Sequence, residues 1–250
     1  MSKDLSIIMP AYNERDRLGS SVTTTLEYLS TQDFKSELIV VDDGSSDDTA
    51  EIARRAAAQF PAVPTRVIRY EENRGKGFAV KTGLLAAGGD IALFSDADLS
   101  TPIAELPKLL DPIRSGEYDV TFGSRALDRS LIGTHQPWRR EQGGRVINLL
   151  IRTVSGLPFA DTQCGFKAFR MSRFRPLLDV MKIDRFGFDV EFLFVAKHHG
   201  LRLAEIPVRW NDVEGSKVSV LRDTRRMFSE LNQIRRNARN SIYATPKIHL

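Results

Sequence analysis

The sequence predicts an α/β protein whose open, mostly parallel and twisted sheet is flanked by helices, within one domain of 250 residues. Two observations predict this class. Short, uninterrupted apolar segments alternate with amphipathic segments along the first half of the chain, which is the order of strands and crossover helices in parallel sheets. Charged and small residues directly follow several apolar segments, and ligands of such sheets bind at the carboxyl ends of the strands.

The strands of the first half are expected where apolar runs are short and bounded by polar or turn-forming residues. The runs that share these properties are residues 5–9, 37–41, 66–70 and 91–94, with a fifth strand ending near residue 125. Pro10 and Asp42 follow the first two runs directly and are expected to end them. Helices between these strands then give right-handed crossovers.

The intervening helices are predicted from apolar residues at spacings of three and four. Such a stripe runs from Leu18 to Leu29 and would cover one face of the sheet. Ser45 or Ser46 is expected to cap a second helix, and Thr101 to cap a later one. Small residues over 78–87 predict the helix between the third and fourth strands.

The second half of the chain is less regular. A polar stretch over 126–142 precedes a predicted helix with apolar residues from Val146 to Val154. The remaining predicted elements are a strand over 165–170, a Phe-rich helix over 188–194, a strand over 203–210 and a final basic helix. The single domain thus divides into residues 1–125, 126–217 and 218–250.

Composition excludes several classes of protein. Hydrophobic residues make up 42% and charged residues 27% of the chain, an ordinary globular balance rather than a disordered or fibrous one. The single cysteine, Cys164, predicts a reducing cytoplasmic location, and the longest apolar runs are too short to cross a bilayer. Glycine-rich fingerprints of P-loop and dinucleotide-binding proteins are missing.

The segment SDADL, residues 95–99, is the most informative for chemistry. Asp96 and Asp98 directly follow the fourth strand, and two hard carboxylate ligands suit Mg²⁺ or Mn²⁺ bound to a diphosphate. Paired aspartates are also common as helix caps or solvated turns, so the pair alone does not establish a metal site. A nucleophilic aspartate of the dehalogenase-type phosphatases is disfavoured, because their DxD motif follows an early strand, whereas Asp96 and Asp98 follow the fourth.

Five ordered motifs resemble the family 2 glycosyltransferases of GT-A fold. They are IIMPAYNE (7–14), IVVDDGSSDDT (39–49), NRGKGFAVKTG (73–83), SDADLS (95–100) and FGSR (122–125). In the second half, DTQCGFKAF (161–169), FDVEF (188–192), EIPVRW (205–210) and EGSK (214–217) resemble the branch that makes polyprenyl-phosphate sugars. Dolichyl-phosphate β-glucosyltransferases are the nearest group, and departures at Gly143 and Asp212 from the mannose-synthase pattern favour glucose.

The resemblance implies the residues that bind a nucleotide-sugar donor. Near the base and ribose it places Pro10, Tyr12, Glu14 and Asp43, and near the diphosphate Lys76, Asp96 and Lys217, with Arg74 also in reach. Asp96 and Asp98 would hold the Mg²⁺ or Mn²⁺. The structural alternative is that Pro10 only ends a strand and Asp43 only caps a helix.

For the acceptor, the resemblance implies that Arg125 and one of Arg139 or Arg140 hold a lipid phosphate. Arginine forks suit phosphate oxygens. Asp161 is the first candidate for positioning or deprotonating the acceptor and Asp189 the second, with Glu191 also available, and Asp98 completes the proposed catalytic set. The alternative for Asp189 and Glu191 is an exposed helix face.

The expected partners are therefore UDP-glucose and a polyprenyl phosphate at the cytoplasmic membrane face. The final helix combines Met227, Phe228, Leu231 and Ile234 with several arginines, so it can either contact anionic lipid or pack on the sheet. A soluble hydroxyl acceptor, GDP-mannose as donor, and a non-catalytic binder of nucleotide sugars or nucleic acid are the alternatives. The basic tail lacks the interleaved aromatic residues of a single-strand binder, so no nucleic-acid partner is expected.

Overall fold

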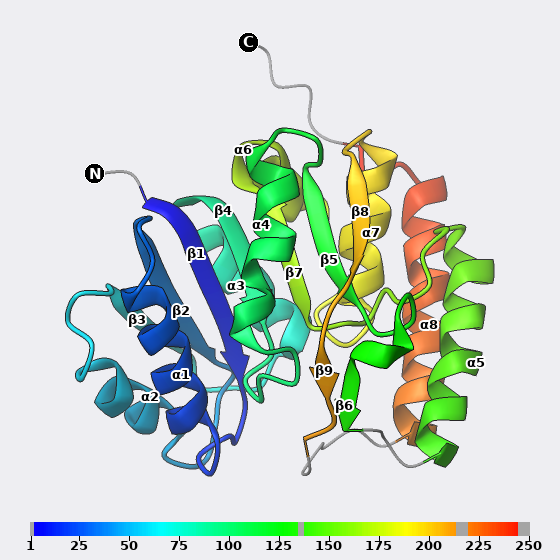
Figure 1. The fold of residues 1–250 in the computed structure, drawn as a ribbon. Helices are drawn as coiled ribbons and strands as arrows, with labels where there is room; N and C mark the ends of the chain where they lie inside the picture. The colour runs from blue at the N-terminus through cyan, green and yellow to red at the C-terminus, as the bar shows by residue number, and fades with distance from the viewer. Residues whose placement is uncertain (1–2, 135–137, 214–219, 245–250) are drawn as a thin grey trace.

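The computed structural model describes residues 3–134, 138–213 and 220–244, without the side chains of 138–146 and 220–225. One seven-stranded sheet runs through the molecule in the order β3-β2-β1-β4-β7-β5-β8 (Figure 1). All neighbouring strands are parallel except at β7, which is antiparallel to both β4 and β5. The predicted open, mostly parallel sheet is confirmed.

The first half alternates strands and helices as the sequence predicts. Its elements are β1 (Lys3–Ala11), α1 (Leu18–Ser30), β2 (Ser36–Asp42), α2 (Thr49–Ala57), β3 (Thr65–Arg69), α3 (Lys76–Ala86) and β4 (Gly89–Ser95). The chain moves outward from β1 to β2 and β3 and then returns to place β4 on the other side of β1. The sheet therefore has a topological switch point between β1 and β4, where ligands of such folds bind.

The rest of the chain, from residue 103 onward, adds the other side of the sheet. Its helices are α4 (Leu106–Arg114), α5 (Trp138–Ser155), α6 (Met171–Phe174), α7 (Phe188–His198) and α8 (Val220–Arg239), with short 3₁₀ turns at Ile103–Glu105, Arg129–Leu131 and Arg175–Val180. Its strands are β5 (Val120–Ser124), β6 (Ile132–Thr134), β7 (Phe166–Arg170), β8 (Leu203–Pro207) and β9 (Trp210–Asn211). The predicted strand over 203–210 is two strands, and β9 leaves the main sheet to pair with β6.

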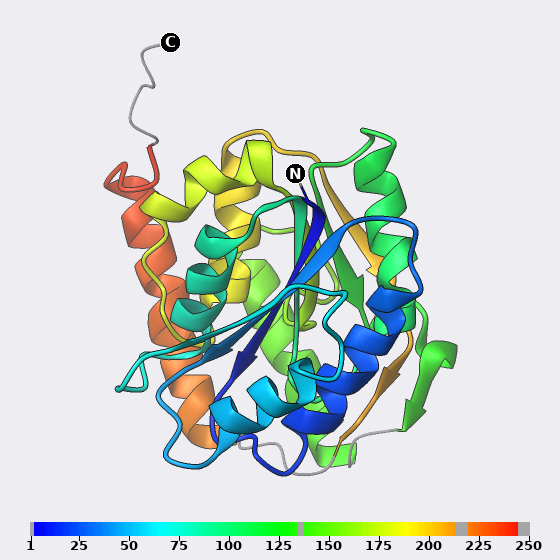
Figure 2. The same ribbon diagram turned by 90° about the vertical axis from the view of Figure 1, so that its left-hand side faces the viewer.

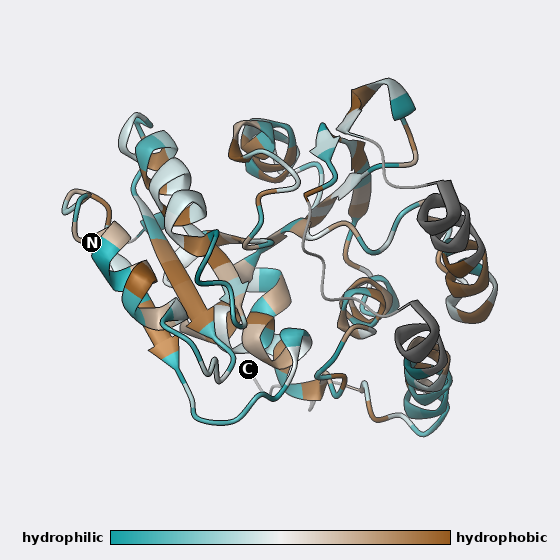
Figure 3. Ribbon diagram, turned by 90° about the horizontal axis from the view of Figure 1, so that it is seen from below, coloured by the Kyte–Doolittle hydropathy of each residue, from teal (hydrophilic) through white to brown (hydrophobic). Residues whose placement is uncertain are grey.

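Helices cover both faces of the sheet (Figures 2 and 3), and each face has its own apolar core. The core under α1, α2 and α4 includes Leu26 and Leu110, while the core under α3, α5, α6, α7 and α8 includes Phe94, Phe169 and Phe192. The strand residues between them are almost fully buried. Because helices cover both faces, a binding site is expected at the ends of the strands.

Pro10 does not end β1, contrary to the sequence prediction. It pairs in register with Val41 of β2, whereas the pairing of β1 with β4 ends at Ile8. A residue without an N–H is tolerated where a strand has no neighbour to accept from it. The strand therefore continues through Pro10 to Ala11.

The helix caps predicted from hydroxyl residues were also wrong. Helix α2 begins at Thr49, and the residue at its N-cap is Asp48 rather than Ser45 or Ser46. Helix α4 begins at Leu106, after a 3₁₀ turn, and not at Thr101. In both places a loop separates the end of the strand from the start of the helix.

The C-terminal helix α8 packs on the molecule. Met227, Leu231 and Ile234 are at most 5% exposed and belong to the core beneath α5 and α7, whereas Phe228 is 45% exposed. Three of the four apolar residues that could have contacted lipid are therefore buried in the core and cannot reach a lipid surface. None of the described helices combines the length and the apolar character that crossing a bilayer requires.

We predict that Leu231→Ala lowers the free energy of unfolding by about 2–5 kcal/mol, since it leaves a cavity in a packed core. Phe228→Ala, on the exposed side of the same helix, is the matched control and should cost less than about 1 kcal/mol. Urea denaturation of both variants measures the difference. Equal effects would contradict the docked position of α8.

Candidate active site

A cavity of about 490 Å³ opens at the carboxyl ends of the parallel strands beside the switch point. Its walls contain seven residues that were expected from the sequence to bind donor or metal: Pro10, Tyr12, Glu14, Asp43, Lys76, Asp96 and Asp98. They come from the ends of β1, β2 and β4 and from the start of α3. A second hollow of about 430 Å³ lies between α2 and β3 and contains none of them.

Asp96 lies in the cavity wall and is closely fitted to the chain. Its amide donates to the Gly165 carbonyl at 3.0 Å. A Cβ atom at Gly165 would overlap with the Asp96 carboxylate, so only glycine leaves room for this side chain. Gly165 of the DTQCGFKAF motif therefore packs directly against Asp96 of the SDADL motif.

Lys76 forms an ion pair with Asp96, with 2.5 Å between Nζ and Oδ1. Burial favours the neutral amine, but the carboxylates of Asp96, Asp189 and Asp98 outweigh it and raise the pKa of Lys76. The ammonium is therefore charged at neutral pH. Arg74, which was also expected near a diphosphate, turns away: its guanidinium lies 3.5 Å from the centre of the Phe78 ring, and it does not line the cavity.

The two aspartates are suited to a hard cation. Asp96 Oδ1 is shielded from solvent, and the one contact that the structure gives it among the described residues is the Lys76 ammonium. Asp98 accepts a hydrogen bond from the Ser100 amide at 2.9 Å. Within the described ranges no three His, Cys, Asp or Glu residues cluster as a metal cage. Two carboxylates fit a cation that takes further oxygens from a diphosphate and water, as Mg²⁺ commonly does.

Asp43 anchors the loop in front of α3. Its carboxylate accepts hydrogen bonds from the Arg74 amide at 2.8 Å and from the Gly75 amide and Asn73 Nδ2, both at 2.9 Å. Gly75 has φ +111°, and a Cβ there would overlap with the backbone carbonyl of Asp184. Asp43 thus fixes the segment that presents Lys76.

The helix-cap alternative for Asp43 is wrong. Helix α2 begins only at Thr49, and Asp48 occupies its N-cap position. The carboxylate of Asp43 instead points to the loop before α3, where it accepts the hydrogen bonds described above. Its structural role is therefore to join the end of β2 to the start of α3.

Glu14 and Tyr12 form the outer wall. Glu14 is paired with Arg17, whose Nη2 donates to Glu14 Oε1 at 2.8 Å. The Glu14 amide donates to Thr49 Oγ1 at 2.8 Å. The Asn13 amide donates to Ser45 Oγ at 2.9 Å and so joins the same two loops. The loops after β1 and β2 are therefore held together as one edge of the cavity.

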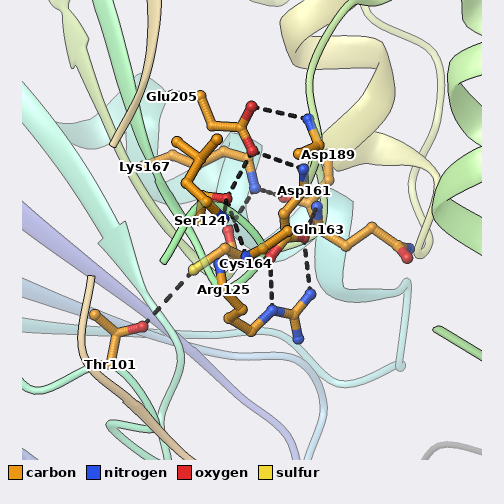
Figure 4. A network of polar contacts seen from close by, with 12 residues as sticks. Thr101, Ser124, Arg125, Asp161, Gln163, Cys164, Lys167, Asp189 and Glu205 are labelled. Atoms are coloured by element: carbon orange, nitrogen blue, oxygen red, sulfur yellow. Dashed lines mark hydrogen bonds and ion pairs between the residues drawn. The ribbon is translucent and has the colours of Figure 1, made fainter. Parts of the chain in front are cut away.

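Arg125 and Asp161 form a second charged pair, outside the lining of the cavity (Figure 4). Arg125 Nε and Nη2 donate to the two carboxylate oxygens at 2.6 and 2.9 Å, and the Arg125 amide adds a third bond at 3.1 Å. Burial would raise the pKa of Asp161, but the charge and hydrogen bonds of Arg125 lower it below its usual range. An ionised carboxylate held in this way is a poor proton acceptor, so the geometry favours positioning over deprotonation.

Glu205 of β8 supports this pair (Figure 4). Its carboxylate accepts from the Asp161 and Ala160 amides at 2.7 and 2.8 Å and from Ser124 Oγ at 2.7 Å. Ser124 and Arg125 are adjacent in the chain. One carboxylate therefore fixes the backbone on both sides of the contact between Arg125 and Asp161.

Asp189 is buried and paired with Lys167. Lys167 is fully buried and donates to Asp189 Oδ1 at 2.5 Å and to the Cys164 carbonyl at 2.6 Å. Burial raises the pKa of Asp189, while Lys167 and Lys76 act in the opposite direction. Glu191 is also buried and accepts from the Ile183 amide at 2.8 Å. The exposed-face alternative for Asp189 and Glu191 is wrong, because the first turns of α7 are enclosed on every side.

Some of the expected residues cannot be placed. Lys217 lies outside the described residues, and Arg139 and Arg140 fall in the first turn of α5, where the side chains are not described. The sequence interpretation also missed four charged residues in or beside the site: Arg17, Arg185, Lys167 and Glu205. Lys167 lies in the DTQCGFKAF motif and Glu205 in the EIPVRW motif. Each is a charged residue in a predicted strand, which could have indicated a buried ion pair or hydrogen-bond network.

Comparisons with known proteins show the family of this chain. The family model "Glycosyl transferase family 2" matches residues 6–178. A dolichyl-phosphate beta-glucosyltransferase from Drosophila melanogaster is 36% identical over 231 residues, covering 87% of this chain and 70% of that protein. One from Dictyostelium discoideum is 32% identical over 241 residues, covering 92% and 73%.

Solved structures resemble the fold. Glucosyl-3-phosphoglycerate synthase from Mycobacterium tuberculosis, in complex with Mn²⁺, uridine diphosphate and glucosyl-3-phosphoglycerate, aligns with a TM-score of 0.68. The alignment covers 98% of this chain and 82% of the synthase at 22% sequence identity. At this identity the likeness concerns the GT-A fold and not the substrates.

Proposed function

We propose that this chain, which belongs to glycosyltransferase family 2, transfers glucose from UDP-glucose to a polyprenyl phosphate such as dolichyl phosphate, with inversion at the anomeric carbon. The observation that carries the proposal is the placement of Asp96, Asp98 and Lys76 in one cavity at the switch point. The names of the relatives supply the sugar and the lipid acceptor.

The donor half is residues 1–125 in this proposal. Pro10, Tyr12 and Glu14 bind the nucleoside end, and Asp43 holds the loop that presents Lys76 toward the diphosphate. Asp96 and Asp98 would hold Mg²⁺ or Mn²⁺, which as a Lewis acid offsets the charge that develops on the leaving diphosphate. Lys76 contributes a second positive charge at the same place.

The acceptor half is residues 126–217 in this proposal. A phosphate acceptor is ionised at neutral pH, so its attack on the anomeric carbon needs no strong base. The lowered pKa of Asp161 fits that requirement, because this carboxylate orients Arg125 instead of taking a proton. Arg125 then offers its guanidinium to the acceptor phosphate, as arginine forks do. Arg139, Arg140 and Lys217 keep the roles that the resemblance implies, and Asp189 positions Lys167 beside the site.

An acceptor assay tests the proposed substrates. The protein is incubated with UDP-glucose carrying radioactive glucose, Mg²⁺ or Mn²⁺, and dolichyl phosphate in detergent. We expect the label to enter the organic phase, and to stay in water when EDTA replaces the metal ion. A matched reaction with phosphoglyceric acid distinguishes a soluble acceptor: transfer only to that compound would contradict the proposal.

We predict that Asp98→Ala lowers kcat/KM by at least about 100-fold, since one carboxylate is a weak anchor for a cation and diphosphate. Titration calorimetry should show that UDP affinity in the variant no longer depends on Mn²⁺. Asp16→Ala removes a carboxylate that is 94% exposed and serves as the control. Wild-type turnover and metal dependence in the Asp98 variant would refute the assignment.

We also propose that α8 brings the enzyme to anionic membranes through charge. Arg236 and Arg239 are exposed on the helix, and each basic residue near such a surface contributes about 1 kcal/mol.

We predict that Arg236→Gln combined with Arg239→Gln weakens binding to phosphatidylserine vesicles about tenfold or more, measured by flotation. Arg54→Gln combined with Arg55→Gln on α2, where both side chains are more than half exposed, is the control with the same change in net charge. Equal flotation of both double variants would contradict this role of α8.

A further inference from the structure

Arg185 is a cation of the cavity that neither the motifs nor the proposed mechanism uses. Among the described residues, three basic side chains line the cavity: Arg17, Lys76 and Arg185. Arg17 is paired with Glu14 and Lys76 with Asp96. The side chain of Arg185 makes no hydrogen bond or ion pair with any described residue. Within the described part of the chain, the cavity wall therefore offers a positive charge that no carboxylate neutralises by direct contact.

The backbone around Arg185 is fixed in place. The Asp184 carbonyl accepts from the Phe78 amide at 3.0 Å, and the Arg185 carbonyl accepts from the Phe188 amide at 3.2 Å. On the other side, the Gly187 amide donates to Glu230 Oε2 of α8 at 2.7 Å. Arg185 thus projects from a segment held between α3 and α8. A residue on such a fixed segment loses less conformational entropy when it binds a ligand.

The side chain of Arg185 runs past the loop that carries Lys76. A Cβ atom at Gly75 would lie 2.8 Å from Arg185 Cγ, so the arginine stem passes against the residue just before Lys76. Arg185 is partly buried, unlike a freely solvated surface arginine. Lys76 and Arg185 therefore enter the cavity from adjacent positions.

A competing interpretation pairs Arg185 with Glu230. The two charges do interact, since Arg185 lowers the pKa of Glu230 against the larger raising effect of burial. Glu230 Oε2 is however taken by the Gly187 amide, and the two side chains form no ion pair within 4.0 Å although the structure describes both. Glu230 acts on the backbone of this segment and leaves the guanidinium available.

We propose that Arg185 binds a phosphate group of the substrate in this cavity. Its planar guanidinium can hold two phosphate oxygens with two parallel N–H bonds of fixed geometry, whereas an ammonium such as that of Lys76 acts as a point charge. The inference rests on the proposed function for its ligands. The donor diphosphate and the acceptor phosphate share the chemistry that Arg185 recognises, and separate measurements identify which one it binds.

The test compares Arg185→Gln and Arg185→Lys with Arg173→Gln, a control at an exposed position of α6. Titration calorimetry with UDP and with uridine, each with Mn²⁺, reports phosphate recognition by the donor site. KM values for UDP-glucose and for dolichyl phosphate report the two substrates in turnover. We expect Arg185→Gln to lower the affinity for UDP about tenfold and to leave the affinity for uridine unchanged. The UDP affinity of Arg185→Lys should lie between those of Arg185→Gln and wild type.

The outcomes separate the two possible sources. If UDP binds normally to Arg185→Gln and the KM for dolichyl phosphate rises about tenfold, Arg185 binds the acceptor phosphate. If UDP affinity and both KM values stay within about twofold of wild type, the role of Arg185 is overturned while glucose transfer by wild type still supports the proposed function. A wild-type protein that binds no nucleoside diphosphate would overturn both.

Discussion

The contact between Asp96 and its neighbours is the constraint on which the site depends. Asp96 follows β4 at the switch point, hydrogen-bonds through its amide to Gly165 before β7, and pairs through Oδ1 with Lys76 at the start of α3. Three segments that are distant in sequence meet at this one residue. The antiparallel β7 is what brings Gly165 there, so the strand that breaks the parallel pattern also completes the carboxylate's surroundings.

Two charge pairs give the halves of the site different properties. The ion pair of Lys76 and Asp96 is partly exposed in the cavity. The pair of Arg125 and Asp161 is held by Glu205 and is largely enclosed. In the proposed function, the donor with its cation would bind beside the first pair, and Arg125 of the second pair would bind the acceptor phosphate. The buried Lys167 is neutralised by its own partner, Asp189, since an unpaired charge there would be costly.

Much of the fold could be predicted from sequence, because buried parallel strands are apolar and their helices are amphipathic. The cavity at the switch point was predictable for the same reason: residues that follow β1, β2 and β4 must meet at the carboxyl ends of these strands. The predictions that were wrong concern features that tertiary contacts decide. Pro10 continues β1 because its β4 neighbour has ended, and Asp189 is buried because α7 is covered all round near its start. Arg185 belongs to a loop with no periodic pattern, and only folding places it beside Lys76.

The most direct test of this account is a crystal grown with Mn²⁺ and UDP, with diffraction recorded at the manganese absorption edge. We predict one anomalous peak within coordination distance of Asp98 and of the diphosphate, with Asp96 turned from Lys76 toward the same ion. A manganese peak elsewhere, or UDP bound in this cavity with both carboxylates away from any metal density, would contradict the central claim.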